Sequence, residues 1–268
     1  MFSRHLYRPS LGLLVLLSLV ARPLTAVALD ASERGLEIAR EVDKRDTGWH
    51  DLKAEMTMLL RNRQGQTSLR EMRSRSLEVP DDGDKTLIIF DRPRDVKGTA
   101  LLTWSHKSGQ DDQWLYLPAL KRVKRISSKN KSGPFMGSEF AYEDLASQEV
   151  EKYTYRYIGE DDLGGMPVYV NERDPVDPNS GYTRQRVLID KARFIPLKID
   201  FYDRKNELLK TLELRGYKQY LGKYWRPDEM FMQNHQTGKS TLLTWKSYAF
   251  QQGLGDRDFT RNSLKRAK

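Results

Sequence analysis

The feature that most restricts how this chain folds is a two-residue alternation of apolar and polar side chains, which recurs between residues 52 and 250. Successive side chains of a β-strand point to opposite faces, so the alternation is typical of strands with one buried face. In the first segment the apolar positions are Leu52, Ala54, Met56, Met58 and Leu60. About eleven such segments follow one another, separated by turns. The sequence therefore predicts a mainly β fold in a single antiparallel sheet, which curls because open sheets of this size rarely stay flat.

A curled sheet of this size encloses a space that its own side chains cannot fill, so a helix, a ligand or both must enter it. Residues 30–44 provide one helix, because Asp30 and Glu33 form a capping box at its start and Gly48 follows its end. Its apolar residues recur at helical spacing at Leu36, Ala39 and Val42. We expect this N-terminal helix to help fill the inside of the sheet.

A second filler is the segment that follows the strand predicted at residues 121–126. Residues 127–137 are rich in Ser, Gly and Pro, which indicates a loop, and a short helix is predicted to begin after it. Phe135, Phe140 and Tyr142 provide the apolar side of this flap. We expect the flap to be mobile and to cover the mouth of the sheet, because its apolar surface needs a cover.

Cations cluster just before the flap, at Lys121, Arg122, Lys124, Arg125, Lys129 and Lys131. Carboxylates follow within the flap, at Glu139, Glu143 and Asp144. Two interpretations stay open. The cations either pair with these acids across the loop, or they dock to anionic head groups or to a partner protein. The residues that we assign to such docking are Lys121, Arg122, Lys124 and Arg125.

The segments QWLYLP, KRVKRI and GSEFAYEDL, which lie between residues 113 and 145, resemble the signature of the outer membrane lipoprotein-sorting protein family, the LolA-like periplasmic carriers. The match is specific over residues 104–145 and extends as a pattern of one helix and many strands. The resemblance implies a single unclosed antiparallel β-barrel of about eleven strands, with an N-terminal helix and a short helical flap plugging its mouth. It also implies an apolar cavity for acyl chains.

The predicted cavity residues lie on the apolar sides of the alternating strands or on the strands of the signature. They are Met56, Met58, Trp104, Trp114, Tyr116, Leu197, Ile199, Phe201, Leu212 and Leu214. Lys210 is the one charged residue that the same register places inside. The alternative is that these side chains pack only against the helix and one another, which would leave no space for a ligand.

The N-terminus has the pattern of a signal peptide, with Arg4 and Arg8 before an apolar run at residues 11–21 and small residues at 26–28. We expect cleavage after Ala28 and one domain over residues 29–268; an uncleaved membrane anchor is the alternative. The formal charge of +9 would fall to about +6, because Arg4, Arg8 and Arg22 leave (9 minus 3). In an exported protein this charge favours anionic lipid or acidic membrane proteins over nucleic acid; the alternative is a basic surface that is simply solvated.

Residues for catalysis are sparse. The chain has no cysteine, so disulfides and thiol chemistry are excluded. Single histidines occur at His50, His106 and His235 without a partner at metal-ligand spacing. The flap carboxylates Glu139, Glu143 and Asp144 could act as acid and base, although helix capping and ion pairing explain them more simply. We therefore predict a protein that is not an enzyme and that holds no metal or cofactor.

The family resemblance implies a soluble, monomeric periplasmic carrier that takes a lipid or lipoprotein from an inner-membrane transporter of the RND/MMPL or ABC type and passes it toward the outer membrane. The alternative is a sensor with the same fold, which binds a lipid or lipoprotein as a signal and regulates a membrane partner. The sequence does not identify the cargo.

Overall fold

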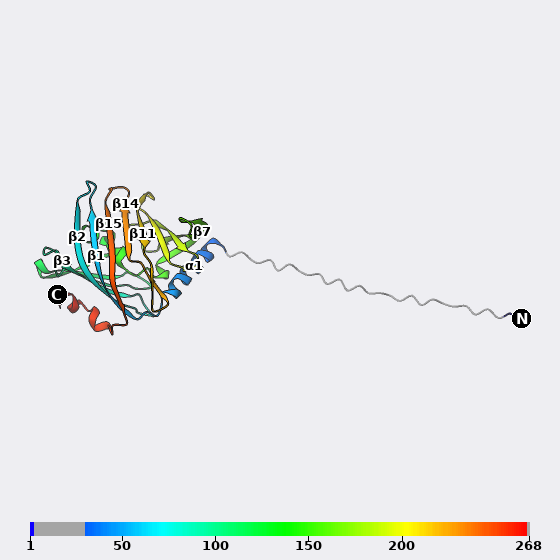
Figure 1. The fold of residues 1–268 in the computed structure, drawn as a ribbon, viewed down its shortest axis with the longest axis horizontal. Helices are drawn as coiled ribbons and strands as arrows, with labels where there is room; N and C mark the ends of the chain where they lie inside the picture. The colour runs from blue at the N-terminus through cyan, green and yellow to red at the C-terminus, as the bar shows by residue number, and fades with distance from the viewer. Residues whose placement is uncertain (3–29, 267–268) are drawn as a thin grey trace.

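The structure is a computed structural model that describes residues 1–2 and 30–266. Thirteen strands form one antiparallel sheet, and two more form a separate hairpin (Figure 1). The sheet contains β1 (Asp51–Arg61), β2 (Thr67–Leu77), β3 (Lys85–Arg92), β4 (Ala100–Trp104), β5 (Asp112–Leu117), β6 (Arg122–Ile126), β7 (Tyr153–Asp162), β8 (Pro167–Pro175), β9 (Arg184–Asp190), β10 (Pro196–Tyr202), β11 (Leu208–Arg215), β14 (Glu229–Asn234) and β15 (Ser240–Phe250). The hairpin consists of β12 (Lys218–Tyr220) and β13 (Tyr224–Arg226). The predicted mainly β fold is confirmed, with thirteen strands in the sheet instead of about eleven.

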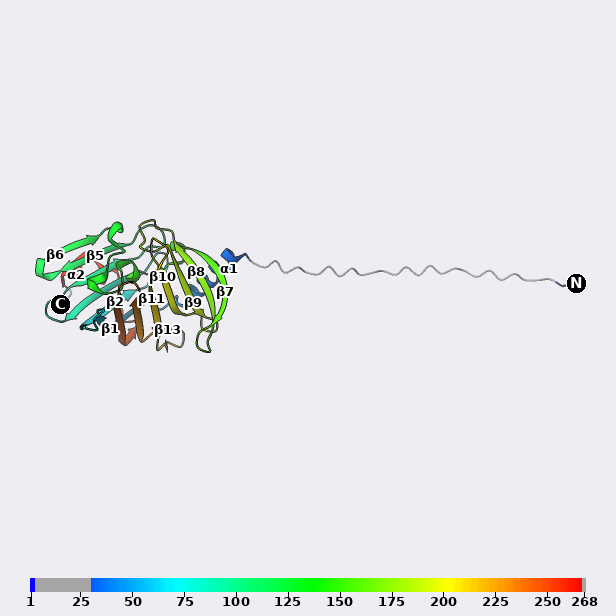
Figure 2. The ribbon, with the colours of Figure 1, turned by 90° about the horizontal axis from the view of Figure 1, so that it is seen from above.

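The order of strands explains why the sheet is unclosed. It runs β6-β5-β4-β3-β2-β1-β15-β14-β11-β10-β9-β8-β7, so the first and last strands pair in the middle, with Leu52 opposite Phe250. The two edges are β6 and β7, which are consecutive in the chain. Figure 2 shows β5 and β6 at one end of the molecule and β7 and α1 at the other. The connection between the two edge strands must therefore cross the open side of the sheet.

The N-terminal helix α1 (Ala31–Arg45) begins where the sequence predicts, because the Asp30 side chain accepts hydrogen bonds from the backbone N–H groups of Ser32 and Glu33. The helix packs along β7. Gly35 makes this close approach feasible, since a Cβ there would lie 2.8 Å from Asn171 Oδ1 and from the backbone nitrogen of Tyr157. The Asn171 Nδ2 donates to the Gly35 carbonyl at 2.9 Å and fixes the helix on the sheet.

The connection between the edge strands, residues 127–152, forms a plug inside the curved sheet. It contains short 3-10 turns: η2 (Ser128–Asn130), η3 (Phe135–Gly137), η4 (Tyr142–Leu145) and η5 (Val150–Lys152). Phe135 and Phe140 are completely or almost completely buried in the main core, where the Phe135 ring lies 5.6 Å from that of Phe90. The predicted flap is thus a packed element of the interior, not a loose cover over it.

The outer face of β3, β4 and β5 carries a second apolar cluster. Leu87 and Ile89 belong to this cluster, whereas Ile88 and Phe90 belong to the interior core, as the strand alternation requires. The C-terminal segment covers it through the fully buried Phe259, in η6 (Asp256–Phe259), and through Leu264, in α2 (Arg261–Arg266). Within the described residues, no helix is long and apolar enough to cross a membrane.

Candidate functional site

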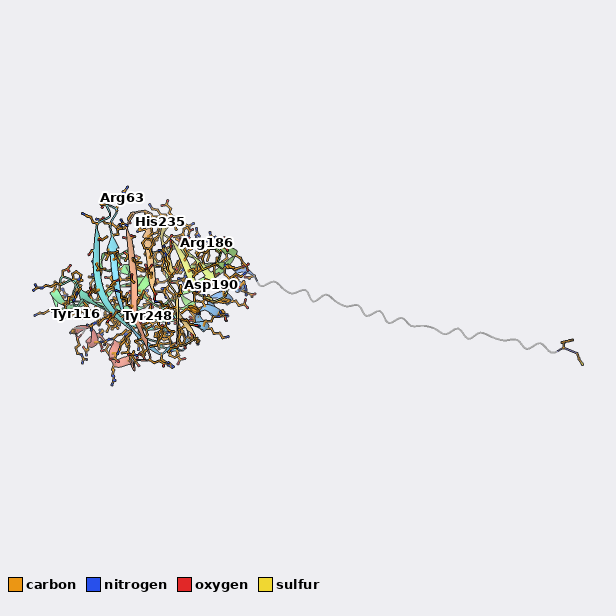
Figure 3. The ribbon with its side chains drawn as sticks, viewed as in Figure 1. Arg63, Tyr116, Arg186, Asp190, His235 and Tyr248 are labelled. Carbon is orange, nitrogen blue, oxygen red and sulfur yellow. The ribbon has the colours of Figure 1, made fainter. Side chains whose placement is uncertain are left out.

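A cavity of about 660 Å³ lies inside the sheet beside the plug, a size typical of small-ligand pockets. Its walls come from the C-terminal half of α1, from one rim of the sheet, from the plug and from the β12–β13 hairpin. The apolar wall includes Val42, Leu52, Ile88, Val187, Met230 and Leu243. Tyr248, another wall residue, lies at one end of the long strands, whereas Arg63 and His235 lie at the other end (Figure 3). The cavity therefore lies toward the end of the strands that carries Tyr248.

The structure brings part of the predicted ligand set to this cavity. Ile199 and Leu214 line it, and so does Phe140 of the predicted flap. Four others share the interior core but pack beside the plug without lining the cavity, namely Met56, Met58, Phe201 and Leu212. Phe135 and Tyr142 of the flap also pack in this core, with their rings 5.7 Å apart. Ligand binding at these positions remains a prediction.

Leu197 does not lie with Ile199 and Phe201, although all three alternate along one strand. The pairing of β10 with β9 shifts between Pro196 and Lys198, and this bulge changes the direction of the side chain at 197. Leu197 instead packs in a separate cluster with Val168, Leu188 and Ile195. A bulge is not visible in a pattern of apolar residues, which is why the sequence placed Leu197 with the interior.

Trp104, Trp114 and Tyr116 are also separate from the cavity. They pack in the outer cluster beneath Phe259 and Leu264, and the Trp104 indole N–H donates to the Phe259 carbonyl at 2.7 Å. β5 is apolar on both faces, so its sequence does not tell which side faces inward. The side that does so carries Leu115, which belongs to the interior core.

A buried ion pair fastens the plug to the sheet. Lys210 lies opposite Phe201 on the inside of β11, and its Nζ donates to Asp144 Oδ2 at 2.6 Å and to the Glu139 carbonyl at 2.8 Å. The two side chains are only 4% and 5% exposed. The Tyr182 hydroxyl donates to the other oxygen of Asp144 at 2.7 Å. The cation that interrupted the apolar pattern of β11 thus has its partner in the plug.

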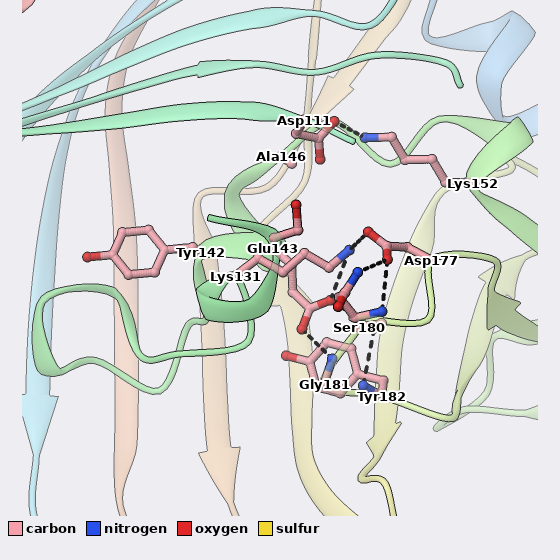
Figure 4. Close-up of polar contacts among 12 residues, drawn as sticks. Asp111, Lys131, Tyr142, Glu143, Ala146, Lys152, Asp177, Ser180, Gly181 and Tyr182 are labelled. Carbon is pink, nitrogen blue, oxygen red and sulfur yellow. Dashed lines mark hydrogen bonds and ion pairs between the residues drawn. The ribbon is translucent and has the colours of Figure 1, made fainter. Parts of the chain in front are cut away.

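A second group of polar contacts joins the plug to the loop between β8 and β9 (Figure 4). The Glu143 carboxylate accepts hydrogen bonds from the Ser180 hydroxyl and from the Gly181 backbone N–H, each at 2.8 Å. Lys131 Nζ lies 2.8 Å from Asp177 and 4.0 Å from Glu143. Burial raises the pKa of the Glu143 carboxyl, and the nearby Asp144 charge adds to the effect. These contacts hold the plug at several points along its length.

The six cations before the flap separate into two groups. Lys131 pairs with acids as described, and Arg125 pairs with Asp112. Among the residues that the structure describes, the other four make no ion pair, and all are exposed: Lys121, Arg122, Lys124 and Lys129. Pairing across the loop therefore accounts for Lys131 but not for Arg122 and Lys124 of the edge strand β6 or for Lys121 and Lys129 on either side of it.

Carboxylates gather at the mouth of the cavity, which the sequence did not predict. The group comprises Asp43, Asp46, Glu78, Asp84 and Glu149. Burial, and to a smaller extent the Glu149 charge, raises the pKa of Asp84 to about 7. Asp46 pairs with Arg226 at 2.5 Å. These acids come from the end of α1, from the turn between β2 and β3 and from the plug. Because these elements are far apart in the sequence, no sequence motif predicts that the acids meet.

The mouth does not provide a metal site. Over residues 1–2 and 30–266, no group of three or more His, Asp or Glu side chains is arranged to hold a metal ion. The His106 ring makes a hydrogen bond through Nδ1 to Asp82, a cavity-lining residue, at 2.6 Å, and this hydrogen bond lowers the pKa of Asp82 to about 2. The cavity is suited to an apolar ligand with a polar group near the rim.

Known proteins resemble this chain over most of its length. A family model described as that of an uncharacterized protein matches residues 82–266. A Vibrio parahaemolyticus domain assigned to outer membrane lipoprotein sorting is 61% identical, over 87% of this chain and 99% of that chain, with a TM-score of 0.86. A DUF1329 family protein from Desulfovibrio piger is 32% identical, over 88% and 100% of the two chains, with a TM-score of 0.83.

A more distant structure shares the fold. It is a LolA superfamily protein from Nitrosomonas europaea, 20% identical over 88% of this chain and 100% of that chain, with a TM-score of 0.67. This likeness supports the open-barrel architecture alone. No curated protein matches the chain significantly.

Proposed function

Because this chain belongs to the outer membrane lipoprotein-sorting protein family, we propose that it is a periplasmic carrier which holds the acyl chains of a lipid or lipoprotein in its cavity. In this proposal the protein receives its cargo from an inner-membrane transporter and delivers it toward the outer membrane. The proposed signal peptide, residues 1–28, falls almost entirely outside the described residues. N-terminal sequencing of protein from the periplasm should begin at Leu29.

The observation that carries the proposal is the cavity of about 660 Å³ with an apolar wall inside the sheet. Each buried methylene contributes about 0.8 kcal/mol, so ten methylenes would contribute roughly 8 kcal/mol before ordering costs. That gain supports capture in about the micromolar range, which still permits release. Such reversible capture is what a carrier requires.

The carboxylates of the plug support a binding function more than catalysis. Asp144 is bound to Lys210 and Tyr182, and Glu143 accepts hydrogen bonds from Ser180 and Gly181. Acids that hold a structural element in place are poorly suited to exchange protons with a substrate. We therefore propose that the protein acts without chemical turnover.

The exposed cations of β6 are the proposed docking element for anionic head groups or for an acidic surface of a membrane protein. Arg122 and Lys124 on the edge strand, and Lys121 just before it, are exposed and have no acidic partner in the described chain. Such attraction is screened by salt, so docking through these residues should weaken as ionic strength rises.

Mass spectrometry of the protein purified from periplasm would test the carrier proposal directly. Lipids with acyl chains should remain bound in the native protein, and a fluorescent fatty acyl probe should compete with them. A strain without the protein should mislocalise the same lipids. Protein that carries no lipid and binds no acyl probe would contradict the proposal.

A further inference from the structure

The β12–β13 hairpin stands at the mouth of the cavity. Lys223 and Trp225 line the cavity, and Lys223 Nζ donates to the Thr47 carbonyl just after α1 at 2.6 Å. Arg226 is bound to Asp46 at the same place. The hairpin is therefore fixed to the end of α1, and its tip directly precedes the cavity-lining residue Lys223.

The tip is a tight turn with an unusual residue in it. The Lys223 N–H donates to the Tyr220 carbonyl at 3.0 Å, and the two central residues, Leu221 and Gly222, have φ angles of +50° and +66°. Turns of this kind favour Asn and Gly, because a side chain with a Cβ is strained at positive φ. The turn between β10 and β11 follows this preference, with Asn206 at φ +61°, whereas Lys121 and Phe194 are, like Leu221, exceptions to it.

Leu221 has no structural reason to be a leucine. Its side chain is 55% exposed, so it contributes little to the core, and its backbone conformation is one that leucine disfavours. A strained and exposed apolar residue beside a binding site is more consistent with a function than with folding.

We propose that Leu221 contacts a lipid bilayer: the hairpin tip inserts this side chain among the lipids and brings the cavity mouth to the membrane surface. The inference rests on the proposed carrier function, because membrane contact at the mouth is useful to a protein that loads and unloads a lipid there. Tyr220, next to the leucine, packs against Tyr248 and Phe250 and provides the aromatic ring that is common at membrane interfaces.

A bilayer fits this tip better than a protein partner does. A specific protein interface buries about 800 Å² per partner, whereas a single exposed leucine in a four-residue turn offers a small area. The surroundings carry charges of both signs, with Asp43 and Asp46 beside Lys107 and Lys223, so they offer no further apolar area to a protein partner. One apolar side chain inserted into lipid gives weak, reversible contact, which suits a protein that must leave the membrane again.

The test is flotation of the purified full-length mature protein with vesicles of phosphatidylethanolamine and phosphatidylglycerol. Leu221→Asn should weaken vesicle binding about tenfold or more, because it removes the inserted side chain. Its melting temperature should stay the same or rise, since Asn is well accepted at positive φ. The matched control is Leu69→Asn, at a leucine with 53% exposure on β2 toward the opposite end of the strands, which should leave binding unchanged.

A second variant and a salt series sharpen the result. Leu221→Trp should bind vesicles at least as well as the wild type, and its emission should shift to shorter wavelength when vesicles are added. Binding that survives high salt supports insertion of Leu221. Binding that disappears with salt and is unaffected by Leu221→Asn would assign the contact to the cations of β6 and overturn the inference.

The same samples separate this inference from the proposed function. Leu221→Asn should capture a fluorescent acyl probe in solution as well as the wild type does, but should deliver it to vesicles more slowly. A protein that binds vesicles through Leu221 but captures no acyl probe would support the inference and contradict the carrier proposal. Equal vesicle binding by Leu221→Asn and the wild type would overturn the inference, as would equal weakening by Leu69→Asn.

Discussion

The plug and the cavity occupy the same curved sheet, but they fill it in opposite ways. On the plug side, aromatic rings meet at close distances and a buried ion pair joins Asp144 to Lys210. On the cavity side, the wall is apolar toward the sheet and acidic toward the rim, and about 660 Å³ remains open. Both regions are walled by strands with the same alternation.

The difference teaches that the strand pattern alone does not determine whether an interior is packed or open. The plug between β6 and β7 determines which part of the interior is filled, because its side chains pack against only part of the sheet. Leu212 and Leu214 are two residues apart on one strand, yet the first packs in the filled core and only the second lines the cavity. Variants at matched positions in the two regions can therefore test the division.

The largest effect is expected from Lys210→Met. Removing the cation leaves the Asp144 carboxylate buried without its charged partner, which should lower the free energy of unfolding by about 3–5 kcal/mol in urea denaturation. The control is Lys198→Met, because Lys198 pairs with Asp200 at 3.2 Å and is 32% exposed, so its loss should cost less than about 1 kcal/mol. Similar small losses in both variants would show that the plug is not fastened by the ion pair.

The next test compares Leu212→Trp with Leu214→Trp. At Leu212 the larger side chain overpacks the filled core and should cost about 1–3 kcal/mol of stability. At Leu214 it can extend into the cavity, so it should displace bound acyl probe with little change in melting temperature. Thermal melts and probe titration of both variants measure the contrast. A large stability loss at Leu214 with full probe binding would contradict the assignment of an open cavity.

The acidic rim should make stability depend on pH. The pKa of Asp84 is about 7 in the folded protein against an ordinary value of 3.8, so the folded state holds a proton that the unfolded chain releases between about pH 4 and pH 7. The stabilising effect of protonation is complete below pH 4 and is lost as the pH rises through 7. Glu149, Glu78 and Asp46 act on Asp84 in the same direction.

Asp84→Asn should remove this dependence. At pH 8 the variant should be more stable than the wild type by about 1–2 kcal/mol, because the substitution avoids the cost of burying a charged carboxylate and, to a smaller extent, the repulsion from Glu149, and because solvent reduces both costs at this partly exposed position. Melting temperatures measured from pH 5 to pH 8 provide the check. The melting temperature of the wild type should fall over this range, whereas that of Asp84→Asn should stay nearly constant. Parallel curves would exclude Asp84 as the titrating group.

The smallest effect is expected from Gly137→Ala in the plug. Gly137 has φ +79° and no atom within 4 Å of the position of a Cβ, so the cost comes only from the backbone conformation. We expect a loss of about 1 kcal/mol, measured by urea denaturation. With Gly133 and Gly137 both replaced by alanine, the sequence predicts slower acyl-probe exchange, except that a glycine at positive φ, as Gly137 is, would instead destabilise the fold. Unchanged exchange would argue against any movement of the plug during loading.

Much of the fold follows from local sequence rules. Asp30 caps α1 as predicted, and the period of two marks the strands because each must bury one face. The positions of Leu197 and of Trp114 do not follow, since a bulge and a strand that is apolar on both sides leave the inward face undefined. The direction of a side chain at these two positions depends on how the strand pairs with its neighbour, and the sequence does not show that pairing.

The candidate site was less predictable than the fold. The partner of Lys210 lies 66 residues earlier in the chain, and the acids of the rim come from three separate elements. The one indication in the sequence was Lys210 itself, because a cation at an apolar position of a strand requires an acidic partner in the interior. The open volume itself depends on how far the plug extends, and composition does not define that distance.

The pairing of β1 with β15 has a consequence for how the chain acquires its structure. Leu52 and Phe250 are neighbours in the sheet, so the centre of the sheet cannot form until almost the whole chain is available. Strands on either side can pair early with their sequence neighbours, but the two halves join only when the last strand arrives. Contacts between distant residues slow folding, and unpaired edges of the halves are prone to aggregate meanwhile. We therefore expect slow final assembly and a need for protection of the incomplete chain.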